Sequence, residues 1–296
     1  MTPQVTGLEE FTRVTPFGVR FWDVTAIAAA GAGLTVVTYP DGFPDLRFTA
    51  DVNRTGVYFF HDLPGMRRVE MGSGDESFWA GNLPRIPFTV EVTDPLYRYL
   101  PYRFSILMPV HGLYGILDSP LSPALTPDAT WLPVFSAPAR EMPGPSAVVR
   151  TVLMDDAAGA AAAWTLVTAQ VLGSPMTVGL ADDRGVVTLT LPYPEPRNSP
   201  FASPLGPGSL KLSDQTWPLT ISVYYLPGAP SQTLPDLEEI LHQGAATAWR
   251  DTAHSAPAQG FTLQFGKELV LRSLDSATGR ELPVLLITPA SPPQSI

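Results

Sequence analysis

Cysteine is missing from this 296-residue chain, so disulfide bonds and thiolate metal sites are excluded and the redox compartment stays undecided. Lysine is nearly missing too, since Lys211 and Lys267 are the only two and every positively charged side chain before residue 211 is an arginine. An intramolecular Lys–Asn isopeptide bond, the covalent staple of some adhesin domains, therefore has no lysine available in the N-terminal half of the chain.

The chain also lacks a basic cluster, a long apolar run and a leader segment. Its formal net charge is −10 and its sequence pI is about 4.8, so we expect no nucleic-acid partner and no contact with anionic membranes. Residues 26–37 form the longest run of low polarity, which is rich in Ala and Gly and too short to span a bilayer. Residues 1–10 are polar and acidic, unlike a signal peptide, so we expect assembly in the cytoplasm and no direct membrane insertion.

Apolar and turn-forming residues are plentiful instead. Hydrophobic residues make up 45% of the sequence, and the 33 prolines and 24 glycines predict many short strands joined by turns. Residues 88–93 alternate strictly between apolar and polar, which is typical of a strand with one wet face. Comparable segments are 34–39, 46–52, 102–107, 147–154, 163–171, 176–180, 186–191, 217–225, 261–265, 267–273 and 284–287. The prediction is an all-β fold with two tandem β-sandwich domains, Ig-like or transthyretin-like.

Residues 51–65 predict the β-hairpin around which the chain is organised. The small polar segment 53–56 suits a turn, and residues 57–60, Val-Tyr-Phe-Phe, favour a pleated and half-buried strand. A weaker copy lies at 182–192, and the spacing from its glycine to its proline is seven positions, against eight in the first copy. This repeat indicates two related domains. Because alternate residues of a strand share a face, we expect Tyr58 or Phe60 to point into the core.

Composition divides the chain into five segments. We expect an N-terminal arm at 1–16, a first sandwich at 17–115, a Pro-rich strap at 116–146, a second sandwich with a helical insertion at 147–290, and a tail at 291–296. The strap is rich in proline, which fixes φ and removes a backbone donor, so it is predicted to extend rather than pack as a domain.

One short helix is predicted near residues 235–249, inside the second sandwich. Thr233 is the candidate cap, Pro235 suits the first turn, and the acidic residues that follow suit the positive end of the helix dipole. The apolar positions of 237–241 share one face of this helix. Its end stays open between Gly244 and Trp249.

No catalytic set is recognisable. The four histidines stand in unrelated contexts, and no zinc-protease motif or phosphate-binding glycine loop occurs. Ser73 lies between two glycines but lacks the strand–turn–helix context of a nucleophile elbow, so a flexible loop is the simpler interpretation. His61 and Asp62 are either a His–Asp dyad or, more simply, an ordinary hairpin end. We therefore expect no enzyme activity, no catalytic residue and no cofactor.

Acidic pairs and large aromatic side chains are the remaining candidates for binding. Asp155-Asp156 and Asp182-Asp183 offer calcium ligands, but neither pair has the spacing of a calcium loop, so Asp-rich turns are the alternative and no metal site is predicted. The aromatic residues suit either a sugar-binding platform or anchors for packing and protein–protein contact. The predicted interface candidates are Phe78, Trp79, Trp131, Phe135 and Trp249.

The hairpin resembles carboxypeptidase-regulatory-like domains. Their pattern Asp-x-x-x-x-Gly-x-Tyr-x-Phe-x-x-Leu-Pro is matched here, with the final Leu-Pro one place further on, by Asp51, Gly56, Tyr58, Phe60, Leu63 and Pro64. The resemblance implies a transthyretin-like, seven-stranded β-sandwich, a group that is also similar to the B-type repeats of collagen adhesins. It covers the first domain well and the second in outline.

A longer likeness covers most of residues 17–290. The chain looks like an accessory protein of phage-tail-like, extracellular contractile injection systems. The segments that carry this likeness are 56–65, 87–94, 98–104, 132–140, 179–185, 191–196 and 265–273. The resemblance implies a non-enzymatic structural subunit, in several copies per particle, at the baseplate or at an end of the tube and sheath. Its partners would be the other subunits of a released or membrane-associated particle. The alternatives are a carbohydrate-binding or adhesin-type module, or a sandwich associated with a peptidase domain that this chain does not contain.

Overall fold

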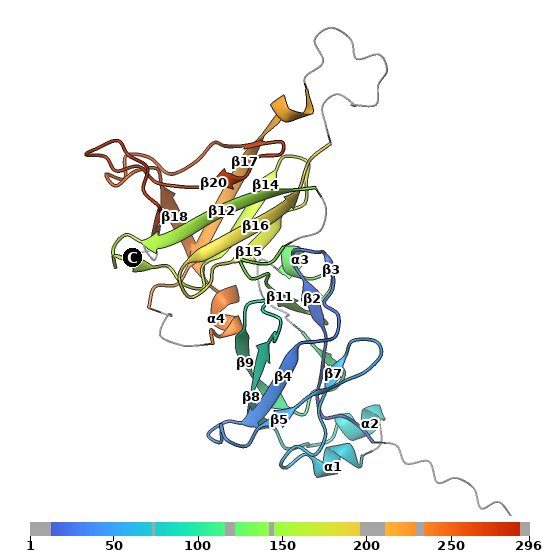
Figure 1. Ribbon diagram of the computed structural model, residues 1–296. Helices are drawn as coiled ribbons and strands as arrows, with labels where there is room; N and C mark the ends of the chain where they lie inside the picture. The colour runs from blue at the N-terminus through green and yellow to red at the C-terminus, as the bar shows by residue number, and fades with distance from the viewer. Residues whose placement is uncertain are drawn as a thin grey trace, which may run out of the picture.

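The computed structural model describes residues 13–72, 75–115, 122–141, 145–195, 211–228 and 234–290. Two β-rich bodies are stacked one above the other, with the N-terminal body below and the C-terminal body above (Figure 1). The predicted all-β, sandwich-type fold is confirmed. Residues 1–12 of the expected arm, the tail at 291–296, Ser73 and Thr233 lie outside the described residues.

The first body is a sandwich of antiparallel strands and short parallel additions. Its strands are β1 Gly18–Val19, β2 Phe21–Asp23, β3 Ala28–Ala29, β4 Thr35–Pro40, β5 Phe48–Thr49, β6 Asp51–Val52, β7 Tyr58–Phe59, β8 Ile86–Thr93, β9 Tyr102–Met108, β10 Leu113–Tyr114 and β11 Leu132–Val134. One layer has the order β5-β4-β8-β9, and the other contains β10-β1-β7-β6 and β11-β2-β3. Along β9 the side chains alternate between buried and accessible, so the even-numbered apolar residues form the core.

The second body repeats this architecture with longer strands. Its strands are β12 Ser146–Asp155, β13 Ala160–Ala161, β14 Leu166–Val171, β15 Thr177–Leu180, β16 Val186–Pro192, β17 Thr216–Tyr225, β18 Gly244–Trp249, β19 Phe261–Gln264, β20 Leu269–Val270 and β21 Leu285–Pro289. They follow the order β13-β12-β21-β18-β17-β14-β15, with β16 and β20 on β12 and β19 on β17. Its core is a second apolar cluster that includes Leu153, Val187, Leu263 and Ile287.

The two segments of the predicted repeat have the same turn. In each copy a side-chain oxygen three residues before the glycine accepts hydrogen bonds from the backbone amides two and four residues further on. The distances are 2.9 and 3.0 Å to Asn53 Oδ1, and 2.9 and 2.8 Å to Asp182 Oδ1. Gly56 and Gly185 have φ of +79° and +76°, the left-handed region that favours glycine. The repeat of the turn is therefore present in atomic detail, but the second copy is not a β-hairpin: β6 pairs with β7, whereas β15 pairs with β14 and β16 pairs with β12.

The repeat extends beyond the turn to a buried aspartate at the end of a strand near the start of each body. Asp23 ends β2 and Asp155 ends β12, and each carboxylate accepts hydrogen bonds from two amides of the following turn. Each also accepts a hydrogen bond from a tyrosine hydroxyl, Tyr99 at 2.8 Å and Tyr225 at 3.1 Å. Burial and the neighbouring carboxylate raise the pKa of both tyrosines to about 12, so both hydroxyls stay protonated donors.

The expected strap is in fact the last strand of the first body. β11 pairs in parallel with β2, as β21 pairs in parallel with β12. Leu132 and Phe135 are 0% and 1% exposed and belong to the first core. Residues 122–141 therefore complete the first sandwich, beyond the expected boundary at 115. Pro133 is compatible with this role because β11 ends its group of strands, where a missing N–H is tolerated.

The helix predicted near 235–249 is shorter than expected. Helix α4 spans Leu237–Leu241, and the second half of the predicted helix is strand β18, which pairs with both β17 and β21. Tertiary pairing on both sides outweighs local helix propensity there. The cap is Asp236, whose carboxylate accepts a hydrogen bond from the amide of Glu238 at 2.9 Å.

Other helical turns occur in segments expected to be loops. They are α1 Arg67–Glu70, α2 Glu76–Trp79, α3 Ser122–Leu125 and the 3₁₀ turn η1 Leu212–Asp214.

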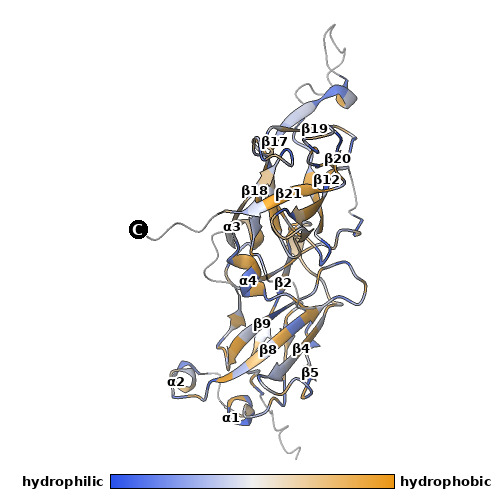
Figure 2. Cartoon of the chain, turned by 90° about the vertical axis from the view of Figure 1, so that its left-hand side faces the viewer, coloured by the Kyte–Doolittle hydropathy of each residue, from blue (hydrophilic) through white to orange (hydrophobic). Residues whose placement is uncertain are grey.

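A continuous apolar core joins the two bodies. Helix α4 lies between them, above β9, in both views of the chain (Figures 1 and 2). Its apolar face and the buried residues Trp164 and Leu166 of the second body belong to the same cluster as the core of the first body. The Arg103 amide of β9 also donates to the Pro235 carbonyl at 2.9 Å. The joint is therefore packed like a domain interior rather than like a hinge.

Candidate functional site

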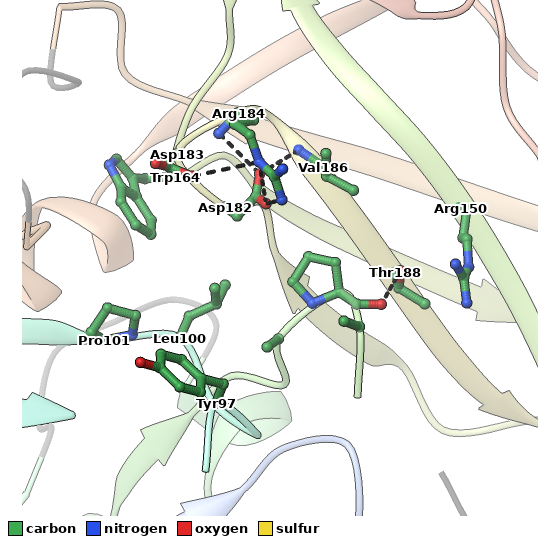
Figure 3. A pocket seen from close by; sticks show the side chains of 13 residues that line it. Tyr97, Leu100, Pro101, Arg150, Trp164, Asp182, Asp183, Arg184, Val186 and Thr188 are labelled. Carbon is green, nitrogen blue, oxygen red and sulfur yellow. Dashed lines mark hydrogen bonds and ion pairs between the residues drawn. The ribbon is translucent and has the colours of Figure 1, made fainter. Parts of the chain in front are cut away.

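A cleft of about 830 Å³ opens where the two bodies meet (Figure 3). That volume lies within the range of ordinary ligand pockets. Its lining comprises Tyr97, Leu100 and Pro101 of the first body, Ala137, Pro138 and Ala139 of the connecting chain, and Arg150, Trp164, Asp182, Asp183, Arg184, Val186 and Thr188 of the second body. Apolar groups dominate the interior, and charged groups stand at the rim.

Asp94 organises the loop that carries Tyr97 to the cleft. The carboxylate accepts hydrogen bonds from the amides of Leu96 and Arg98 at 3.2 and 2.8 Å, and from the Arg98 guanidinium at 2.9 and 3.1 Å. Tyr97 has φ of +54° and Leu96 and Tyr97 are 68% and 83% exposed. A bulky residue in this backbone region is strained, and the hydrogen bonds to Asp94 hold it there. Two large exposed side chains on a braced loop are typical of a contact surface.

We expect the stability of the chain to depend on Asp94 in acid. Burial alone would raise the pKa of this carboxyl, but the hydrogen bonds from Arg98 and Leu96 outweigh it, so the pKa is lowered. The unfolded chain therefore binds this proton more tightly than the folded chain does. The stability that Asp94 contributes is complete above the pKa of the unfolded chain, about 3.9, and is lost as the pH falls through the lower pKa of the folded chain.

The measurement is urea unfolding of wild type and Asp94→Asn at a series of acidic pH values. Below about pH 4 the wild type should lose stability more steeply than Asp94→Asn. Asp45→Asn, which changes an exposed aspartate, is the control and should follow the wild type. Equal slopes for wild type and Asp94→Asn would contradict the linkage.

The charged side chains that line the cleft are largely paired. The Asp182 carboxylate, which also accepts the hydrogen bonds of its turn, forms an ion pair with Arg184 at 3.0 Å. Arg150 forms an ion pair with Glu268 at 2.8 Å. Asp183 remains accessible, with 74% of its side chain exposed. No group of three or more potential metal ligands occurs in the part of the chain that the structure describes. The cleft is thus suited to contact with an amphipathic ligand rather than to binding a metal ion.

The predicted interface residues do not gather in one place. Phe78 and Trp79 lie on α2, where both are half-buried against the first core, and Trp79 stacks on His111 with 4.8 Å between ring centroids. Trp249 lies at the end of β18 in the second body and stacks on His254, with 4.4 Å between ring centroids. These aromatic residues are anchors within the chain, with one ring face covered in each indole.

The two candidates in the expected strap have different surroundings. Trp131 is half-buried, and the Arg20 guanidinium lies 3.9 Å from its ring centroid. Phe135 is buried inside the first core, so the structure contradicts its assignment to an interface with another protein. The physical reason is that β11 carries the chain directly into the sandwich.

Histidine and acidic residues singled out in the sequence have structural partners. Asp62 pairs with Arg13, while the His61 ring makes an edge-to-face contact with Phe59, with 5.1 Å between ring centroids, so the two neighbours do not act together as a dyad. Asp156 lies 2.8 Å from His254 Nε2. Asp155 and Asp182 hold turns, as the alternative interpretation of Asp-rich turns predicted, and Asp183 is exposed at its turn.

We expect chelators to leave the chain unchanged, because the acidic pairs are engaged with turns and basic side chains. The measurement is the melting temperature with and without EDTA. A drop of several degrees that calcium restores would contradict this prediction, since a ligand that binds only the folded state raises its stability.

Comparisons with known proteins give little further information. No family model matches the sequence, and no curated protein matches it either. Two crystal structures of mutants of the shaft pilin spaA from Lactobacillus rhamnosus GG are similar at 11% identity. One covers 93% of this chain and 99% of that chain with a TM-score of 0.23, and the other covers 98% and 94% with a TM-score of 0.22. At such TM-scores the likeness carries no argument.

Residues missed in the sequence are those that line the cleft from the first body. Tyr97, Leu100 and Pro101 belong to a turn between two strands, and nothing local distinguishes them from other turn residues.

In the described ranges no helix is long and apolar enough to cross a membrane.

Proposed function

We propose that the chain is a non-enzymatic structural subunit that works through protein–protein assembly. The observation that carries this proposal is the cleft: two sandwiches packed through one apolar core present a braced loop with exposed Leu96 and Tyr97. Two adjacent large apolar side chains held out on a rigid loop suit burial against a partner, because a few such residues can supply most of the binding energy of an interface.

The setting that we propose is a phage-tail-like contractile particle, with several copies of the chain at the baseplate or at an end of the tube and sheath. The support is the resemblance of seven sequence segments, three of which meet at the cleft. Segment 98–104 contributes Leu100 and Pro101, segment 132–140 contributes its residues 137–139, and segment 179–185 contributes the hairpin tip.

A carbohydrate-binding module is the alternative. Sugar platforms need accessible aromatic rings gathered on one surface, whereas Trp79, Trp131 and Trp249 are half-buried on separate elements and Trp217 is buried. Binding to a glycan array that is lost with Trp79→Ala would favour this alternative over assembly.

The test of the assembly proposal is sedimentation of extracts from cells that make the chain at its natural level. We expect the chain in fast-sedimenting fractions together with tube and sheath proteins, and incomplete particles when its gene is deleted. Sedimentation only as a free protein of 31.9 kDa, with complete particles in its absence, would contradict the proposal.

A further inference from the structure

Strand β16 has an edge that is unpaired among the described residues. β16 pairs with β12 only. The Leu153 amide donates to the Gly185 carbonyl at 2.8 Å, and the Leu271 amide donates to the Arg150 carbonyl at 2.9 Å. The backbone N–H and C=O groups of the odd-numbered residues of β12 therefore point toward β16, and those of the even-numbered residues point away from it. Because this register pairs Val149 with Leu189, the backbone N–H and C=O groups of the odd-numbered residues of β16 face β12, and those of the even-numbered residues face outward.

The outward groups beyond the turn are the backbone N–H and C=O groups of Thr188 and Thr190. Those of Val186 are already bonded to Asp182, since the Asp182 amide donates to the Val186 carbonyl at 2.9 Å. No backbone partner of Thr188 or Thr190 on this side occurs within the described ranges. Four hydrogen-bonding groups in a row thus form a template for another strand.

The first body covers the matching edge with a strand of its own. Counted from the glycine of each turn, Phe59 corresponds to Thr188 and Asp51 corresponds to Leu180. Asp51 of β6 pairs with Phe59 of β7, whereas Leu180 of β15 pairs with Leu166 of β14 and not with β16. The second body therefore lacks the strand that its own repeat places beside β16.

This vacant edge opens into the cleft. The lining residues stand on both sides of β16, with Arg150 on β12 and with Trp164 and Asp182 beyond the free edge (Figure 3). Leu100 and Tyr97 face this edge from the first body. A strand added to β16 would therefore lie between the two bodies.

We propose that the cleft receives an extended segment of a neighbouring subunit, which pairs with Thr188 and Thr190 as an added β-strand. This inference rests on the proposed assembly function and gives it a contact. Backbone hydrogen bonds to the edge supply the docking geometry, and alternate side chains of the segment contact the apolar lining around Leu100, Pro101 and Trp164. The partner segment is accordingly extended, with apolar residues at every second position.

Amide hydrogen exchange at single-residue resolution tests the proposal directly. The purified free chain is compared with the chain in the fast-sedimenting assembly from its producing cells. In the free chain, Thr188 and Thr190 should exchange rapidly, and in the assembly they should be slow. Val187 and Leu189, whose amides face β12, should be slow in both samples and serve as internal controls.

The outcomes separate the two proposals. Slow exchange of Thr188 and Thr190 in the free chain would overturn the inference, because the edge would be covered from within. Rapid exchange in the assembly would overturn it as well, while leaving the assembly function intact. Recovery of the chain only as a free monomer would overturn both.

A pair of variants supplies the matched test. Thr188→Pro removes the outward amide without removing a hydrogen bond to β12, and Thr188→Val keeps the amide but loses the hydroxyl that donates to the Pro138 carbonyl at 3.0 Å. Thr188→Val should enter the assembly like wild type, and Thr188→Pro should enter it roughly tenfold less. Equal incorporation of both variants would overturn the inference. If Thr188→Pro fails to fold, the exchange measurement on the wild type decides.

Discussion

Phe60→Ala is expected to lower the free energy of unfolding by about 3–5 kcal/mol, because it removes a large buried ring and leaves a cavity. Phe60 is 1% exposed and stacks on Phe17 with 5.8 Å between ring centroids. Tyr58, on the same face, is 2% exposed, and its hydroxyl accepts a hydrogen bond from the Leu34 amide at 3.1 Å. The hairpin is thus the centre of the first core, as its sequence predicted.

Urea denaturation of the purified chain measures this effect. Phe43→Ala is the control, since Phe43 is 65% exposed and its truncation should change stability by less than about 0.5 kcal/mol. Unchanged stability of both Phe60→Ala and Tyr58→Ala would show that the hairpin does not hold the core.

Phe135→Ala is expected to cost a similar amount, about 3–5 kcal/mol, because β11 brings this ring into the same core. Trp131→Ala, four positions earlier at the half-buried end of β11, should cost clearly less. A strap that only linked two domains would tolerate both changes.

Limited proteolysis of the free chain gives a second readout of the same claim. Because β11 is paired with β2 and buried, the backbone at 132–135 should resist cleavage for as long as the domain stays folded. Early cleavage within 132–135, together with a small effect of Phe135→Ala on the free energy of unfolding, would show that this segment is a linker.

The strands and the repeated turn were predictable because their signals are local. Alternation in β8 and β9 marks one buried face, and the Asn53 and Asp182 turns need a side-chain acceptor and a glycine at fixed spacing. The same local signals misassigned the segment around Pro133. Proline indicates a missing donor, but only the sheet order shows that β11 is an edge strand where no donor is needed.

The cleft could not be predicted from the sequence. Tyr97 and Arg184 belong to different bodies, and only the packing of the two sandwiches brings their loops to one site. The vacant edge of β16 is also a tertiary property. Asp51 and Leu180 occupy equivalent positions before their turns, yet Asp51 pairs with the strand that follows its turn and Leu180 pairs with a different strand, β14. Neither choice is readable from a single strand.

A density map of the purified particle at a resolution that separates β-sheets is the most direct test of the assembly role. The account predicts several symmetry-related copies of two stacked sandwiches at an end of the tube and sheath, each with density from a neighbouring subunit beside β16. A complete particle without density for this chain, from cells in which the chain is free and abundant, would contradict the assembly role itself.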